Sequence, residues 1–183
     1  MKLQIANCRL QIGLQFGVAG GIVVAMLSTS VLRAETIDRV LAVVAGQLIT
    51  LTDVTAARDL RLQTSDGAAD PVRAVLTKLI DRELILAEVD RYAPPEPTSD
   101  AVDREVERVR ARFPSQDALD DALARSGIDG KHLRETLRQD LRVRAYLDQR
   151  FTAASDRRQA LVDDWMGGLR RRGDVIDLYA AAR

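Results

Sequence analysis

The stretch "VLAVVAGQLITLTDV" (Val40–Val54) predicts a strand, a tight turn, a second strand and then a helix cap. Almost all of the sequence after it has the apolar spacing of helices. A lone hairpin is marginally stable in water, because each of its two strands leaves one edge of backbone groups unpaired. The hairpin is therefore expected to pair with another part of the chain.

The composition of the 183-residue chain is typical of a soluble, mainly helical protein. Charged residues make up 30% of the sequence and aromatic residues only 4%. This balance disfavours a β-sandwich and a disordered chain. Once a targeting segment is removed, the remaining length suffices for one domain with a hydrophobic core.

The first 34 residues are expected to be a secretory signal peptide. Lys2 and Arg9 give a basic start, and "IGLQFGVAGGIVVAML" (12–27) forms an apolar centre. Small residues then lead to Ala34, after which we expect cleavage. The alternative is an uncleaved membrane anchor over residues 13–31, because this run is nearly long enough to cross a bilayer. Its glycines disfavour a stable membrane helix.

Removal of residues 1–34 would leave a mildly acidic chain without cysteine. The segment carries three of the 27 basic residues and none of the 27 acidic ones, so the net charge becomes about −3. This charge gives no reason to expect nucleic acid as a partner. Cys8 is the one cysteine in the sequence, so no disulfide or thiol chemistry is expected. Export without disulfides indicates the bacterial periplasm, with membrane contact only through an uncleaved signal segment.

Caps and helix-breaking residues divide the rest of the chain into helices. The helices are expected to run from Thr52 or Asp53 to about Gln63, from Val72 to Tyr92, from Thr98 or Ser99 to Phe113, from Ser115 to Gly127, from Asp129 to Phe151, and from beyond Asp156 to Arg172. The 72–92 helix is apolar well beyond one stripe, so it is expected to lie at the centre of the fold.

A third strand is predicted at the C-terminus, in "DVIDLY" (Asp174–Tyr179). It is the only other strand that the sequence predicts, so it is the natural partner of the hairpin. The predicted fold class is therefore mainly α, with a small β-sheet formed by the N-terminal hairpin and the C-terminal strand. The two ends of the chain would meet in one domain over residues 35–183.

The order of these elements resembles SurA-type periplasmic chaperones. The residues that carry the resemblance are "DRVLAVVAGQLITLTDV" (38–54), "LIDRELILAEVDRYA" (79–93), "DREVERVRARFPSQDALDDALARSGID" (103–129), "HLRETLRQDLRVRAYLDQRF" (132–151) and "LVDDWMGGLRRRGDVIDLY" (161–179). The resemblance covers nearly all of the chain after the signal segment. No single one of these stretches is specific to the family, but their order along the chain is fairly specific.

One departure from the family bears on activity. Members of the family carry parvulin-type prolyl isomerase domains between the long helix and the final Trp-bearing helix, and here only "TAASD" (152–156) stands in that position. A parvulin site requires paired histidines, whereas His132 is the one histidine of this sequence. The chain therefore resembles the chaperone module alone, with no parvulin insert between residues 151 and 156.

No catalytic, metal or cofactor site is expected, and neither is an enzyme. His132 has no second histidine or cysteine with which to hold a metal, so it is interpreted as a surface residue. Asp163 and Asp164 are adjacent, so on a helix they point in different directions and form no acid/base pair. Trp165 is interpreted as a core anchor rather than a binding aromatic.

The remaining class of function is binding. The candidate peptide-binding residues are apolar positions next to chain breaks, where packing is expected to be incomplete: Leu60, Leu62, Tyr92 and Phe113. Addition of a client strand to the edge of the small sheet is an alternative mode. The resemblance and the signal segment together imply a non-catalytic holdase, without cofactor, for unfolded envelope or outer-membrane proteins. The alternative is an envelope adaptor or structural domain that binds one folded partner.

Overall fold

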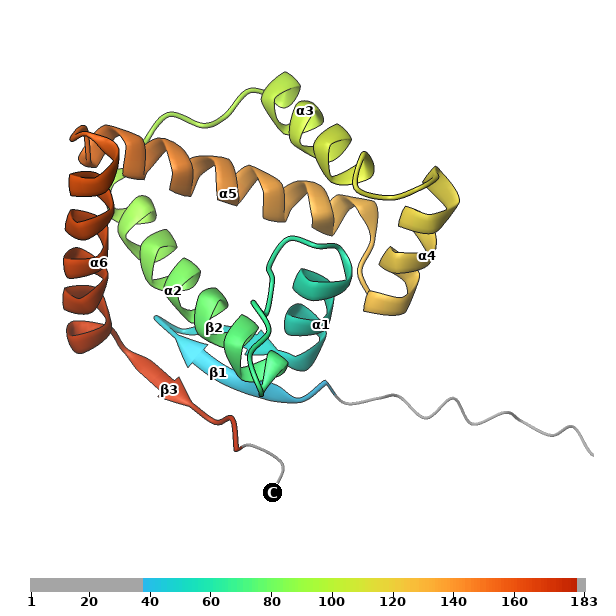
Figure 1. Ribbon diagram of the computed structural model, residues 1–183, viewed down its shortest axis with the longest axis horizontal. Helices are drawn as coiled ribbons and strands as arrows, with labels where there is room; N and C mark the ends of the chain where they lie inside the picture. The colour runs from blue at the N-terminus through green and yellow to red at the C-terminus, as the bar shows by residue number, and fades with distance from the viewer. Residues whose placement is uncertain (1–37, 181–183) are drawn as a thin grey trace, which may run out of the picture. The chain divides into compact units, whose positions relative to one another are not determined.

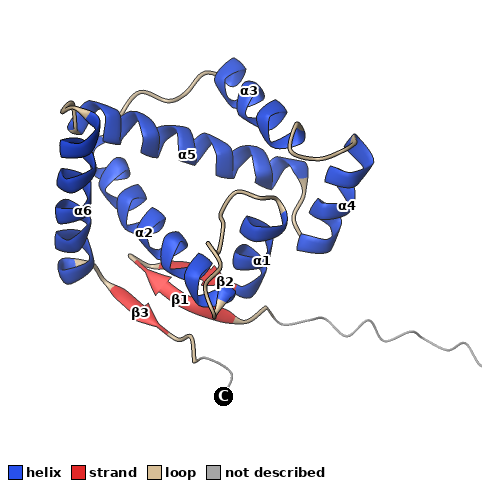
Figure 2. Cartoon of the chain, in the orientation of Figure 1, coloured by secondary structure: helices blue, strands red, loops and turns tan. Residues whose placement is uncertain are grey.

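The computed structural model describes residues 38–180. These residues form a small sheet and a set of helices (Figures 1 and 2). The elements are, in chain order, β1 (Val40–Val44), β2 (Gln47–Thr50), α1 (Leu51–Asp59), α2 (Pro71–Tyr92), α3 (Ser99–Arg110), α4 (Gln116–Ser126), α5 (Gly130–Arg150), α6 (Ser155–Arg172) and β3 (Val175–Asp177). The predicted fold class, mainly helical with one small sheet, is confirmed.

The sheet consists of the N-terminal hairpin and the C-terminal strand, as predicted. Its strand order is β2-β1-β3, and both pairings are antiparallel. Val43 in β1 lies opposite Leu48 on one side and Ile176 on the other. The hairpin turn holds Ala45 and Gly46 at φ of 49° and 82°, which are the positive values that a tight two-residue hairpin requires. The first strand of the domain therefore lies at the centre of the sheet and pairs with the last.

The helix α2 lies at the centre of the fold, which confirms the interpretation of its wide apolar surface. It contacts both strands of the hairpin and the helices α1, α5 and α6 (Figure 1). Val75, Leu76 and Val89 on this helix are fully buried. An N-cap at Asp70 and Pro71 at the first helical position begin the helix, since both residue types favour a helix start.

The buried side chains form two clusters. The first joins the sheet, α2, the C-terminal half of α5 and α6, and includes Val44, Ile85 and Met166. The second joins α1, α3, α4 and the N-terminal half of α5, and includes Leu119 and Leu133. The long helix α5 thus contributes to both clusters, and so does α1, which adds Val54 and Ala57 to the first and Ala56 to the second.

Several helix ends lie where the caps predicted them. Thr98, Ser115 and Asp129 are the N-caps of α3, α4 and α5, each accepting a hydrogen bond from a backbone N–H three residues on. Gly127 ends α4 at a φ of 71°, in the left-handed region that glycine adopts without steric cost.

The boundaries of α1 differ from the prediction at both ends. The N-cap is Thr50 rather than Thr52 or Asp53: its Oγ1 accepts from the Asp53 backbone N–H at 3.2 Å, and the Asp53 carboxylate accepts from the Thr50 N–H at 2.8 Å. This reciprocal pair is a capping box. The helix ends at Asp59, short of Gln63, because Arg61 turns into the left-handed region and the Leu62 N–H bonds back to the Ala57 carbonyl.

Two further elements, α3 and β3, are shorter than predicted. The helix α3 ends at Arg110, and Phe113 lies in the tight turn beyond it, where its N–H bonds to the Arg110 carbonyl. The strand β3 covers Val175–Asp177 rather than the whole of 174–179. The signal segment predicted over residues 1–34, with cleavage after Ala34, lies outside the described residues. Within residues 38–180, no helix has the combination of length and hydropathy needed to cross a membrane.

Candidate binding cleft

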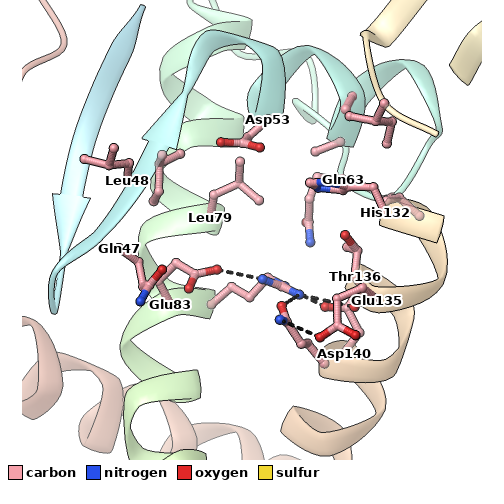
Figure 3. A pocket seen from close by; sticks show the side chains of 17 residues that line it. Gln47, Leu48, Asp53, Gln63, Leu79, Glu83, His132, Glu135, Thr136 and Asp140 are labelled. Atoms are coloured by element: carbon pink, nitrogen blue, oxygen red, sulfur yellow. Dashed lines mark hydrogen bonds and ion pairs between the residues drawn. The ribbon is translucent and has the colours of Figure 1, made fainter. Parts of the chain in front are cut away.

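A cleft of about 280 Å³ lies between β2 and α1, the first part of α2 and the N-terminal half of α5 (Figure 3). The spacing of residues along α2 and α5 determines which side chains line the cleft. Leu79, Arg82 and Glu83 lie three and four residues apart on α2 and so share one face. The α5 residues that line it repeat at the same spacing: His132, Glu135, Thr136, Gln139 and Asp140. The segment after α1 closes one side with Leu62 and Gln63.

The cleft has an apolar lining and a polar rim. Leu79 and Ile128 are half-buried, and each packs against one of the two core clusters. Leu62 packs against the second cluster and also lines the cleft. Around them lie the exposed His132 and Glu135. A small apolar lining with a charged rim suits contact with an amphipathic ligand.

The guanidinium of Arg82 crosses the cleft from α2 to α5. It donates from Nε to Asp140 at 2.6 Å, from Nη1 to Glu83 at 2.6 Å, and from Nη2 to the Gln139 side chain at 3.1 Å and the Thr136 carbonyl at 3.2 Å. The Arg82 side chain is only 14% exposed. The Arg82 side chain therefore links α2 to α5 and forms ion pairs with two carboxylates, Glu83 and Asp140.

The carboxylates of the cleft differ in their surroundings. Burial raises the pKa of Glu83, Arg82 opposes this, and the nearby Asp53 and Asp140 add to it. A hydrogen bond from Arg138 lowers the pKa of Glu135, and both Glu135 oxygens accept from that guanidinium. Asp53 takes part in the capping box of α1 and forms no ion pair within residues 38–180. The cleft thus has more negative than positive charge.

Two further hollows continue the cleft along α2 and α5. The first, of about 530 Å³, shares Leu62, Gln63, Arg82 and Asp140 with the cleft and reaches Val143. The second, of about 100 Å³, is also lined by Leu62 and Asp140 and extends toward α3. Because the three hollows share residues, we treat them as one groove, and Leu62 lines all three parts.

The four predicted peptide-binding residues do not form one site. Leu62 lines the groove. Leu60 is 0% exposed within the second core cluster, so the expectation that its packing is incomplete is wrong; the turn at Arg61 directs it inward. Phe113 is half-buried against the same cluster, with the Arg61 guanidinium 5.3 Å from its ring centre. Tyr92 is 59% exposed at the far end of α2.

Tyr92 belongs to an aromatic corner instead. Its ring stacks on Tyr146 at 5.9 Å, and Trp165 lies 6.1 Å from Tyr146 and 5.4 Å from Phe151. The Arg150 guanidinium lies 5.3 Å from the Trp165 ring centre. Trp165 is half-buried and packs against the first core cluster, which confirms its interpretation as a core anchor.

The sequence analysis missed the residues that form most of the groove. Arg82, Gln139 and Asp140 occur within ordinary charged helix faces, and nothing local distinguishes them. Their three- and four-residue spacing was a usable signal for a shared face, but not for which helix that face meets. His132 is exposed at the rim of the cleft, in agreement with its interpretation as a surface residue.

Within the part of the chain that the structure describes, no group of three or more His, Cys, Asp or Glu side chains is placed to hold a metal ion. The residues that line the cleft present hydrogen-bonding groups, charge and apolar surface. No family model matches this sequence, and no curated protein matches it.

Proposed function

We propose that this protein is a non-catalytic chaperone of the bacterial periplasm that binds unfolded envelope or outer-membrane proteins. The observation that carries the proposal is the groove between α1, α2 and α5, whose three hollows all have Leu62 and Asp140 in their lining. An open groove with apolar side chains at its base and charges at its rim suits an extended segment of an unfolded chain. The order of sequence elements that resembles SurA-type chaperones supports the same function.

The polar groups of the groove support binding rather than catalysis. Glu83 is the group whose raised pKa would most suggest an acid catalyst. Its carboxylate, however, already accepts from Arg82 at 2.6 Å, and burial accounts for most of the shift. Asp140 is held by the same guanidinium, and Asp53 caps α1. These contacts hold the groove together and give its carboxylates no catalytic geometry, so the groove is proposed to act by binding.

The proposal is tested by aggregation of an unfolded outer-membrane protein, followed by light scattering, with and without this protein. Suppression is expected at stoichiometric amounts and without nucleotide. Leu62→Ser should weaken suppression severalfold, because Leu62 lines every part of the groove. The matched control is Leu161→Ser, which changes an exposed leucine on α6 and should leave suppression unchanged.

Hydrogen exchange gives a second measurement that does not depend on a variant. Client binding should protect the amides of α2, α5 and the segment that follows α1. If the client causes no protection and no suppression of aggregation, the chaperone proposal is wrong.

A second candidate, an adaptor that binds one folded envelope partner, is favoured by the outer face of the sheet. Leu48 and Ile176 lie on either side of Val43 and are 60% and 53% exposed. Leu178, which follows two residues after Ile176, is also exposed. Affinity capture from a periplasmic extract separates the two functions: a holdase should return many clients, and an adaptor one partner.

A further inference from the structure

The charges of the 280 Å³ cleft between β2, α1, α2 and α5 point to a particular class of client segment. One guanidinium, Arg82, balances two carboxylates, Glu83 and Asp140. Glu135 is balanced by Arg138. Asp53 has no cationic partner within residues 38–180. A net negative charge therefore stays in a cleft whose base is apolar.

Asp53, which has no cationic partner within residues 38–180, and Glu83, which shares Arg82 with Asp140, lie on the same side of the cleft. Figure 3 shows Asp53, Leu79 and Glu83 along one wall of the cleft. Arg82 donates to Glu83 Oε1 from Nη1 and to Asp140 from Nε, so Glu83 shares this cation with Asp140. Burial raises the pKa of Glu83, and the negative charge of Asp53 adds to that rise. The Asp53 oxygen that accepts from Thr50 is Oδ2, so Oδ1 remains able to accept from a ligand.

A lysine or arginine side chain suits this wall. Its aliphatic stem would lie along Leu79, and its charged end would reach the two carboxylates. Leu62 and Ile128 on the other elements would take the apolar residues of the same segment. An acidic segment would instead meet charges of its own sign, which is unfavourable.

We propose that the cleft between α1, α2 and α5 prefers extended segments that combine apolar residues with a lysine or arginine, whose cationic end lies between Asp53 and Glu83. This inference rests on the proposed function, since it names the class of segment that the same groove would bind. The occupant is part of an unfolded protein chain rather than a second copy of this protein.

The test uses three fluorescein-labelled peptides that are identical in their apolar residues and carry lysine, norleucine or glutamate at one central position. Anisotropy gives the dissociation constant of each peptide for the full chain. The lysine peptide should bind about fivefold more tightly than the norleucine peptide, a typical gain for one partly exposed ion pair. The glutamate peptide should bind most weakly. Added salt should reduce the lysine preference, because mobile ions screen exposed charges.

Two substitutions test whether Asp53 and Glu83 cause the preference for the lysine peptide. Asp53→Asn keeps an oxygen that can accept from the Thr50 N–H, so it leaves the cap of α1 in place. Combined with Glu83→Gln, it should make lysine and norleucine peptides bind equally. Asp121→Asn, an exposed carboxylate on α4, is the matched control and should leave the preference unchanged.

The outcomes separate the two proposals. If all three peptides bind equally, with no effect of salt, the charge preference is wrong and the groove remains a peptide site. If no peptide binds, both the preference and the chaperone function are wrong. If the chain forms a dimer that the peptides dissociate, the groove is occupied by a second copy, which overturns the inference. Trp165 fluorescence confirms that each variant is folded, and the salt dependence of the unmodified chain tests the preference without any variant.

Discussion

Arg82 holds α2 and α5 together across the groove, so its removal should destabilise the fold markedly. Arg82→Met keeps most of the aliphatic stem but deletes four hydrogen bonds, to Asp140, Glu83, Gln139 and the Thr136 carbonyl. Loss of one partner from a buried ion pair costs about 3–5 kcal/mol, because the other charge remains buried and unpaired. Asp140 is about one third exposed and water can solvate it, so we expect about 2–3 kcal/mol here.

Urea unfolding followed by the fluorescence of Trp165 measures this cost, since Trp165 is the one tryptophan of the chain. The melting temperature should fall by roughly 5–10 °C. Arg110→Met is the control: Arg110 also pairs with a glutamate, Glu107, but both side chains are largely exposed, so the substitution should cost no more than about 0.5 kcal/mol. If Arg82→Met lowers the free energy of unfolding no more than the control does, the hydrogen bonds of Arg82 do not hold α2 and α5 together.

The cost of Arg82→Met should also depend on pH. Burial already raises the pKa of Glu83, and Arg82 opposes that shift, so its removal raises the pKa further. A carboxyl whose pKa is raised in the folded state destabilises that state when ionised, and the penalty disappears as pH falls and the carboxyl becomes protonated. The loss of stability should therefore be smaller at pH 5 than at pH 7. Glu83→Gln in the Arg82→Met background should remove this dependence.

Three local features give further tests by urea unfolding. Thr50→Ala removes the cap of α1 and should cost about 1 kcal/mol, against a few tenths for Thr55→Ala inside the same helix. Gly127→Ala should cost about 1 kcal/mol, because alanine is strained at the positive φ of this position. A variant as stable as the parent would contradict the role of Gly127 as the C-cap of α4. Gly173→Ala should cost roughly 1–3 kcal/mol, because its Cβ would lie 2.5 Å from a Leu84 methyl and 2.8 Å from the Leu169 carbonyl. Gly130→Ala, with open space at the Cβ position, should be near neutral.

Local signals in the sequence predicted most of the fold. The caps at Ser115 and Asp129 and the glycine at Gly127 act within one turn of the chain, so the sequence around them is sufficient. The start of α1 was misplaced because three neighbouring residues can all cap a helix. Strand pairing selects Thr50: the Leu51 N–H bonds back to the Arg39 carbonyl at 2.8 Å, which holds the chain in the hairpin up to that residue.

The groove depends on contacts between distant residues, which a single sequence does not contain. Arg82 meets Thr136 and Asp140 more than fifty residues later in the chain. Nothing in "LIDRE" distinguishes this arginine from those on solvated helix faces. Incomplete packing was predicted at Leu60 for a similar reason. A chain break next to a leucine leaves that leucine partly packed only when no neighbouring element covers it, and here residues of the second cluster do.

The central position of β1 also determines when the domain can be completed. β1 is the first and β3 the last element of the described residues, so the inner strand of the sheet keeps one open edge until β3 has been made. The contact between them closes a very long loop, which is slow because of its entropy. Arg73 and Asp70 on the α2 side then hold the returning segment through Asp177 and Tyr179. A chain truncated before Val175 would leave the edge of β1 beside Val44 without its partner strand, so the pairing of β1 with β3 makes completion of the sheet depend on a segment about 130 residues later in the chain.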